Sequence, residues 1–200
     1  VNRDGHDDLA IGAPDWDSSG NDRGAVFVWF GPDVSIPSPA DPTYADNTFY
    51  GSNASAKFGR AIAGGFDVNG DGYTDMAVSD DNVIRLYRGS STGLTLDNSW
   101  SFAAPLNSSG FFGDTLTSAG DVNRDGFGDL LVADAGFGAY PRNGGIVWLF
   151  LGGADGLNNT PVWQMYEQQT GERFGAAVTA AGDINGDGYS DFAIGAHLYD

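Results

Sequence analysis

The sequence predicts an all-β protein built from a repeated unit of four antiparallel strands. An aspartate-rich motif recurs along the chain, and short apolar segments rich in β-branched and aromatic residues follow each copy. No stretch of helical length has apolar residues at 3.6-residue spacing. The 31 glycines have no tripeptide period and occur with only 8 prolines, which indicates tight turns between short strands.

The motif has the form DxNxDGxxD, and it is complete at residues 67–75, 121–129 and 183–191. A fourth copy at the start of the chain lacks its first aspartate. A Phe-Gly pair precedes each complete copy, always with Phe nine positions before the first aspartate. This constant register defines repeat units, which we expect at residues 1–56, 57–110, 111–172 and 173–200.

Three apolar segments per unit follow the motif and predict strands. The first, expected to be buried, comprises Leu9–Ala13, Met76–Val78, Leu130–Ala133 and Phe192–Ala196. The second comprises Ala25–Phe30, Val83–Tyr87 and Ile146–Leu151. A weaker third segment lies around Tyr44–Tyr50, Trp100–Phe102 and Val162–Tyr166. With a strand before the motif, each unit has four strands, and such units bury their faces by stacking radially as the blades of a β-propeller. A β-sandwich is the alternative.

The charge balance narrows the classes of partner. With 27 acidic and 9 basic side chains, the net charge of −18 disfavours nucleic acids and anionic membranes. Much of this charge is concentrated in the motif, where the carboxylates repel one another unless a cation binds. The chain has no cysteine for a thiolate metal site, and no apolar run is long enough to span a bilayer.

The motif carries the oxygen donors that Ca²⁺ prefers, namely carboxylates, amide oxygens and backbone carbonyls on a tightly turned loop. Mg²⁺ fits less well because it demands compact octahedral geometry. An EF-hand would need a glutamate at position twelve, where this chain has Val78, Val132 or Ile194, while simple Asp/Asn/Gly turns remain an alternative. The expected ligands in the complete loop at 67–75 are Asp67, Asn69, Asp71, the carbonyl of Tyr73, and Asp75.

These features resemble the FG-GAP repeat, which is found in the β-propeller of integrin alpha subunits and in many secreted bacterial proteins. The resemblance is carried by the Phe-Gly pairs, the motif loops and the Gly12-Ala13-Pro14 sequence. It implies a propeller, usually of seven blades, in which the calcium loop joins the innermost strand of a blade to the second. We therefore expect about three blades of a longer propeller, incomplete at both ends, with closure of three repeats through overlapping ends as the alternative.

The resemblance also implies the remaining metal ligands, position by position. They are Asn2, Asp4, His6 and Asp8 in a truncated site; Asp121, Asn123, Asp125, Phe127 and Asp129; and Asp183, Asn185, Asp187, Tyr189 and Asp191. Three complete Ca²⁺ sites are thus expected.

No catalytic constellation stands out, and we expect a protein that is not an enzyme. The GxSxG sequence at Gly89–Gly93 lacks a following helix, and the chain has only two histidines, although a pair of loop carboxylates remains open as a glycosidase-type site. We expect an extracellular adhesion or ligand-recognition module, secreted or at the cell surface. The alternatives are a propeller domain of a secreted polysaccharide- or phospholipid-acting enzyme, a glycan-binding lectin, or a structural spacer.

A protein or glycan ligand is expected on the rim opposite the calcium loops. The contact residues expected there are Trp16, Phe137, Tyr140, Arg142 and Tyr199. The alternative is that they are ordinary loop residues. Chance occurrence best explains the glycosylation sequons, which begin at Asn53, Asn107 and Asn158.

Overall fold

The structure, a computed structural model, describes residues 1–17, 22–32, 42–108, 112–138, 144–167 and 171–198. Regular structure in these segments is β, apart from one 3₁₀ turn at Pro42–Tyr44 (η1). The predicted all-β fold is confirmed. Within the segments described, no helix is long and apolar enough to cross a membrane.

The strands form four antiparallel sheets, each with its strands in sequence order. The first sheet contains β1 (Leu9–Ala13), β2 (Ala25–Trp29) and β3 (Asn47–Tyr50). The second contains β4 (Ile62–Phe66), β5 (Asp75–Asp80), β6 (Val83–Arg88) and β7 (Thr95–Ala103). The third contains β8 (Phe112–Gly120), β9 (Asp129–Asp134), β10 (Ile146–Phe150) and β11 (Trp163–Tyr166). The fourth contains β12 (Phe174–Gly182) and β13 (Asp191–Ala196).

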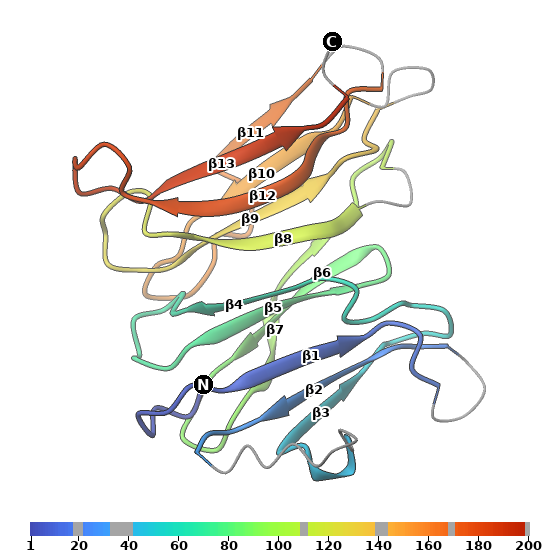
Figure 1. Cartoon of the computed structure of the whole chain (residues 1–200), viewed down its shortest axis with the longest axis vertical. Helices are drawn as coiled ribbons and strands as arrows, with labels where there is room; N and C mark the ends of the chain where they lie inside the picture. The colour runs from blue at the N-terminus through green and yellow to red at the C-terminus, as the bar shows by residue number, and fades with distance from the viewer. Residues whose placement is uncertain (18–21, 33–41, 109–111, 139–143, 168–170, 199–200) are drawn as a thin grey trace.

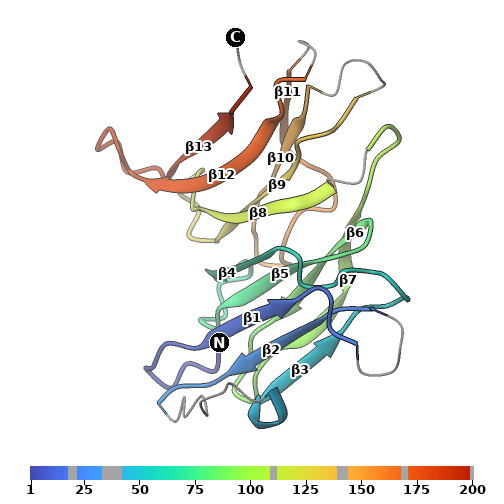
Figure 2. The ribbon, with the colours of Figure 1, turned by 45° about the vertical axis from the view of Figure 1, so that its right-hand side comes forward.

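The sheets stack face to face along an arc, as propeller blades do (Figures 1 and 2). Strand β8 packs against both β4 and β12, and these three are the innermost strands of their blades. Strands β7 and β11 lie at the outer edges of the second and third sheets. The prediction of four-stranded antiparallel blades is confirmed by these two sheets.

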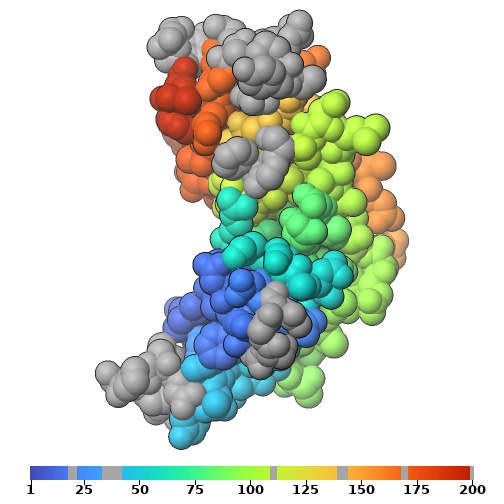
Figure 3. Space-filling model, turned by 90° about the vertical axis from the view of Figure 1, so that its right-hand side faces the viewer, coloured from blue at the N-terminus to red at the C-terminus, as the bar shows by residue number. Residues whose placement is uncertain are grey.

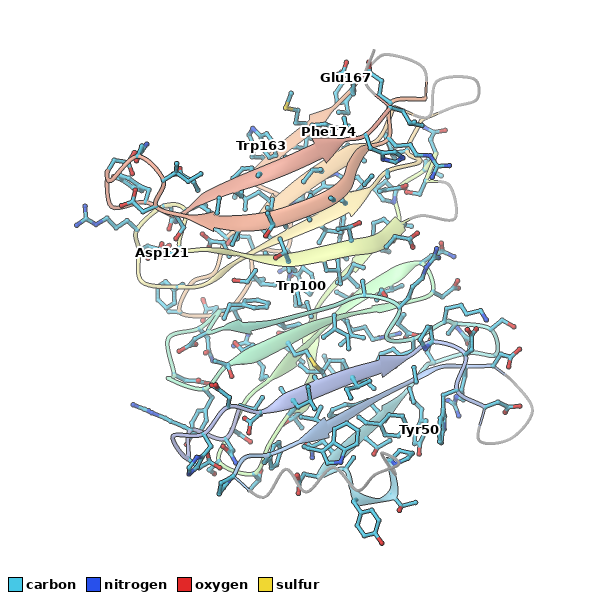
Figure 4. The ribbon with its side chains drawn as sticks, in the orientation of Figure 1. Tyr50, Trp100, Asp121, Trp163, Glu167 and Phe174 are labelled. Atoms are coloured by element: carbon cyan, nitrogen blue, oxygen red, sulfur yellow. The ribbon has the colours of Figure 1, made fainter. Side chains whose placement is uncertain are left out.

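The apolar side chains of the strands form a core between each pair of neighbouring blades. Between the second and third blades, Trp100 of β7 packs edge to face on Phe150 of β10, with ring centroids 5.4 Å apart (Figure 4). Every residue of β5 and β9 is buried, as predicted for the first apolar segment. Strands β1 and β13, expected to be buried in the same way, are only partly buried, because each belongs to an end sheet with a neighbour on one side.

The Phe-Gly pairs dock each blade onto the preceding one. Phe58 is fully buried with Val26 and Val28 of the first sheet, and Phe112 lies in the core between the second and third blades. Phe174 packs, partly exposed, on side chains of the third blade that include Val147. The register found in the sequence thus has a packing cause.

The glycine of each pair allows this close approach. Gly113 and Gly175 have φ angles of 69° and 86°, which L side chains rarely adopt. A Cβ on Gly113 would lie 2.4 Å from Cδ1 of Ile84, and one on Gly175 would lie 2.9 Å from Cγ2 of Val147. Ile84 and Val147 are equivalent residues of the preceding blades, each the second residue of its strand.

Candidate metal loops

The motif loops lie along one rim of the arc. They connect β4 to β5, β8 to β9 and β12 to β13, and the truncated copy leads into β1 (Figure 1, left side). Asp121, the first residue of its loop, lies at this rim, while Phe174 lies at the opposite one (Figure 4). We call them the acidic rim and the opposite rim.

The first aspartate of each complete loop folds the backbone around its own carboxylate. Asp67 accepts hydrogen bonds from the N–H groups of Gly70 and Gly72, both at 2.7 Å. Asp183 accepts equivalent bonds from Gly186 at 2.7 Å and Gly188 at 2.8 Å. These bonds hold the loop in one curl.

The side chains at the third and fifth positions meet in all four copies. The Nδ2 of Asn69 donates to Oδ2 of Asp71 at 2.9 Å, and the N–H of Tyr73 donates to Oδ1 of the same aspartate at 2.9 Å. The Asn-Asp distances in the other copies are 2.9, 2.7 and 2.9 Å, in chain order. Repetition of one geometry at four places indicates a shared function of the motif.

The aspartate at the ninth position of the motif anchors the loop as well as contributing negative charge. Asp75 accepts from the N–H of Val68 at 2.9 Å and from the N–H of Gly89, in the β6–β7 turn, at 2.8 Å. Burial outweighs these bonds and raises the pKa of Asp75 to about 6. Asp129 has equivalent partners, and burial likewise raises its pKa to about 6. Sequence reasoning assigned this position to the metal alone, because the N–H of Gly89 lies outside the motif.

The sixth-position glycine permits the turn, and Gly72 has a φ of 84°. The fourth position, which the motif leaves unspecified, has the same left-handed conformation. It is occupied by Arg3 (φ 62°), Gly70 (φ 72°), Arg124 (φ 61°) and Gly186 (φ 75°). Two loops therefore place an arginine where glycine is favoured.

The donor set fits Ca²⁺ in its chemistry. Each loop gathers carboxylate and amide oxygens within one turn, and a carboxylate oxygen that accepts one hydrogen bond keeps a second lone pair. Within the described segments, no three His, Cys, Asp or Glu side chains are drawn into one metal-binding group. Instead, Nδ2 of Asn69 donates a hydrogen bond to Asp71, and the Asp75 carboxylate accepts hydrogen bonds from backbone N–H groups. Calcium ligation stays a prediction.

Comparison with protein families identifies the repeat. The model described as FG-GAP-like repeat matches residues 67–132, and the model described as FG-GAP repeat matches residues 1–29 and 174–200. The chain belongs to the FG-GAP repeat family. The matches coincide with the motif loops and the strands beside them.

Several curated relatives of this FG-GAP chain are integrin alpha subunits. Integrin alpha-PS5 of Drosophila melanogaster is 32% identical over 164 residues, which is 75% of this chain and 16% of that protein. Integrin alpha-V of Gallus gallus is 29% identical over 211 aligned positions, which is 96% of this chain and 19% of that protein. The FG-GAP chain thus spans less than a fifth of the length of either relative.

Two of the expected ligand contacts on the opposite rim are packed onto their own blade. Trp16 meets Phe27 edge to face with centroids 5.0 Å apart, and Phe137 meets Trp148 in the same way at 5.8 Å. Both are half-buried. They occupy equivalent places, three residues after β1 and β9. Tyr140, Arg142 and Tyr199 lie outside the described residues.

The serine of the GxSxG sequence lies in a turn of the FG-GAP blade. Ser90 Oγ donates to the carbonyl of Gly93 at 2.7 Å, and the next regular element is β7. His6 and His197 are both exposed, at the start and near the end of the chain. No helix follows this serine, so the segment lacks the strand-turn-helix context of a nucleophile elbow.

Proposed function

We propose that this chain is a non-enzymatic, calcium-stabilised FG-GAP propeller module of an extracellular adhesion or ligand-recognition protein. The observation that carries the proposal is the shared geometry of four acidic loops on one rim. The integrin alpha relatives support the adhesion class and a location outside the cell or at its surface.

The residues that would hold Ca²⁺ are the aspartates, asparagines and seventh-position carbonyls of the loops. Bound Ca²⁺ would supply the positive charge that offsets the clustered carboxylates. The protein contributes pre-organisation: Asp67 fixes the curl, and Asp75 ties it to the β6–β7 turn. Millimolar calcium outside cells fills even weak sites with Kd of about 10⁻⁴ to 10⁻³ M.

The metal proposal is tested by calcium titration calorimetry and by thermal unfolding with and without chelator. We expect calcium to raise the melting temperature of the chain and chelator to lower it. Asp71→Ala should reduce the bound calcium by one ion, whereas Asp155→Ala is the matched control. Asp155 is exposed on the acidic rim, and within the described residues its backbone carbonyl accepts a hydrogen bond from Arg88 at 3.0 Å. Equal calcium content in all three proteins would refute the site.

A protein or glycan partner is proposed for the opposite rim, which Figure 3 views directly. Ion pairs between neighbouring blades order its surface, joining Lys57 to Asp15, and Arg60 to Asp114 at 2.6 Å. A partner bound there should lose affinity when Lys57 and Arg60 become alanine and keep it in Asp155→Ala. Glycan arrays and binding to matrix proteins provide the assay. Turnover in a lyase or hydrolase screen would contradict the non-enzymatic proposal.

A further inference from the structure

Neighbouring motif loops are bonded directly to each other. The N–H of Gly128, at the eighth position of its loop, donates to the carbonyl of Asp67 in the preceding loop at 2.7 Å. Ser190 repeats this contact to the carbonyl of Asp121 at 3.0 Å. Each bond ends on the first aspartate of a loop, so neighbouring loops share one hydrogen-bonded framework.

The arginines at the fourth position add a charged side chain to this backbone contact between neighbouring loops. Arg3 lies over Gly72 of the following loop, where a Cβ would be 2.5 Å from its Nη1. Arg124 lies in the same way over Gly188 of the loop that follows it, with Nη1 2.9 Å from the Cβ position. Gly72 and Gly188 both stand at the sixth position, directly after the fifth-position aspartate. Each guanidinium therefore covers the acidic turn of the next loop.

The loop at 67–75 provides an internal comparison. Its fourth residue is Gly70, which has no side chain to extend, and no atom of the described residues lies within 4 Å of the Cβ position of Gly126, at the sixth position of the following loop. Arginine thus covers the loops at 67–75 and 183–191, while the loop at 121–129 is open.

The backbone indicates that these arginines do not owe their place to local conformational preference. Arg3 and Arg124 have φ angles of 62° and 61°, in the left-handed region that glycine fills in the other two loops. A residue other than glycine in this region carries backbone strain, and such strained residues cluster at functional sites.

We propose that Arg3 and Arg124 are positioning residues that weaken calcium binding in the next loop, so that the loops at 67–75 and 183–191 each bind calcium less tightly than they would without the arginine that covers them. The inference rests on the proposed calcium function. Without metal, the guanidinium offsets the carboxylates of the loop that it covers; once a divalent cation is bound, the same charge repels it. For one exposed charge near a divalent ion, this repulsion corresponds to roughly a five- to tenfold loss of affinity at low salt.

The seventh position provides a loop-specific probe. Terbium is a calcium substitute whose luminescence is excited by a nearby tyrosine, and the covered loops contain Tyr73 and Tyr189 where the open loop has Phe127. The part of the signal lost in Tyr189→Phe reports the loop at 183–191, and that lost in Tyr73→Phe reports the loop at 67–75. Phe127 shows that the repeat tolerates this exchange. Displacement of terbium by Ca²⁺ then gives the calcium affinity of each of these two loops.

The test compares Arg124→Gly and Arg3→Gly in the full chain. Glycine is the residue that the other loops carry at this position, so both variants should fold, and Arg124→Gln removes the charge while keeping a side chain. We expect Arg124→Gly and Arg124→Gln to tighten the Tyr189-reported loop five- to tenfold and leave the Tyr73-reported loop unchanged. Arg3→Gly should do the reverse. In 0.5 M salt the gain should shrink, because exposed charges are screened over a few ångströms.

Two results would overturn the inference, and they are distinguishable. Metal binding with less than a twofold change in the loop that follows the substituted arginine, or with equal changes in both reported loops, refutes the arginine effect and leaves the calcium proposal standing. Absence of both terbium and calcium binding in the unsubstituted chain refutes the calcium proposal and the inference together.

Discussion

Replacing Phe112 by alanine tests whether the Phe-Gly pair holds neighbouring blades together. Phe112 is 4% exposed, and its ring lies 5.5 Å from that of Phe102 in the preceding blade and 5.9 Å from that of Trp148 in its own. Truncation of a buried Phe to Ala costs about 3 to 5 kcal/mol, and each aromatic pair contributes about 0.5 to 1.5 kcal/mol beyond area burial. Because the ring packs on an aromatic side chain of each blade, we expect the free energy of unfolding to fall by about 4 kcal/mol.

Urea unfolding followed by tryptophan fluorescence is a suitable assay, because Trp100 and Trp148 belong to the same core. Leu106→Ala is the control: Leu106 is 90% exposed, so its truncation should change the free energy of unfolding by less than about 0.5 kcal/mol. Phe174→Ala should fall between the two, because Phe174 is only partly buried. A loss below about 1.5 kcal/mol for Phe112→Ala would refute the docking role.

Two further predictions concern the same interfaces and loops. Gly175→Ala should destabilise the chain by about 2 kcal/mol more than Gly171→Ala in the same urea assay. Both glycines have φ near 85°, but only Gly175 has Val147 within 3 Å of its Cβ position. Equal losses of stability would show that backbone strain alone acts. Because the pKa values of Asp75 and Asp129 are raised to about 6, these carboxyls take up protons on folding between pH about 4 and 6 in metal-free protein. The stability that they contribute without metal therefore increases as pH falls through 6, whereas calcium, which needs ionised carboxylates, loses affinity. The calcium-induced rise in melting temperature should be less than half as large at pH 5.5 as at pH 7.5. A rise that is the same at both pH values would contradict this assignment.

The strands that follow the motif were predictable because they carry the usual signals of buried β-structure. β9 (DLLVAD) has four apolar residues in a row, and β10 (IVWLF) is apolar throughout and mostly β-branched or aromatic. The residue bounds of the innermost strands could not be predicted from the sequence, because β4 (IAGGF) and β12 (FGAAVTAAG) consist largely of glycine and alanine. Small residues suit strands that pack closely on the strands of neighbouring blades, but they carry little strand propensity.

The loops show a similar division between local and distant causes. The curl around Asp67 follows from the motif, because its partners lie within five residues. The second partner of Asp75 is Gly89, two strands away, and the space covered by Arg124 belongs to a different blade. Only the alternation of arginine and glycine at the fourth position was visible in the sequence, and its meaning required knowledge of which loops are neighbours.

The nine-residue offset between Phe and the first aspartate equals the length of the innermost strand in the third and fourth blades, whereas β4 of the second blade has five residues. β8 runs from Phe112 to Gly120 and β12 from Phe174 to Gly182, so the Phe-Gly pair and the acidic loop stand at opposite ends of one strand. At about 3.3 Å per residue, nine residues carry the chain across the blade from one rim to the other. The third and fourth blades are therefore each fastened to the preceding blade twice, by aromatic packing at the opposite rim and by a loop-to-loop hydrogen bond at the acidic rim. Insertion of one residue within β8 would therefore prevent both contacts from forming in register at the same time, since it turns every following side chain to the other face of the sheet.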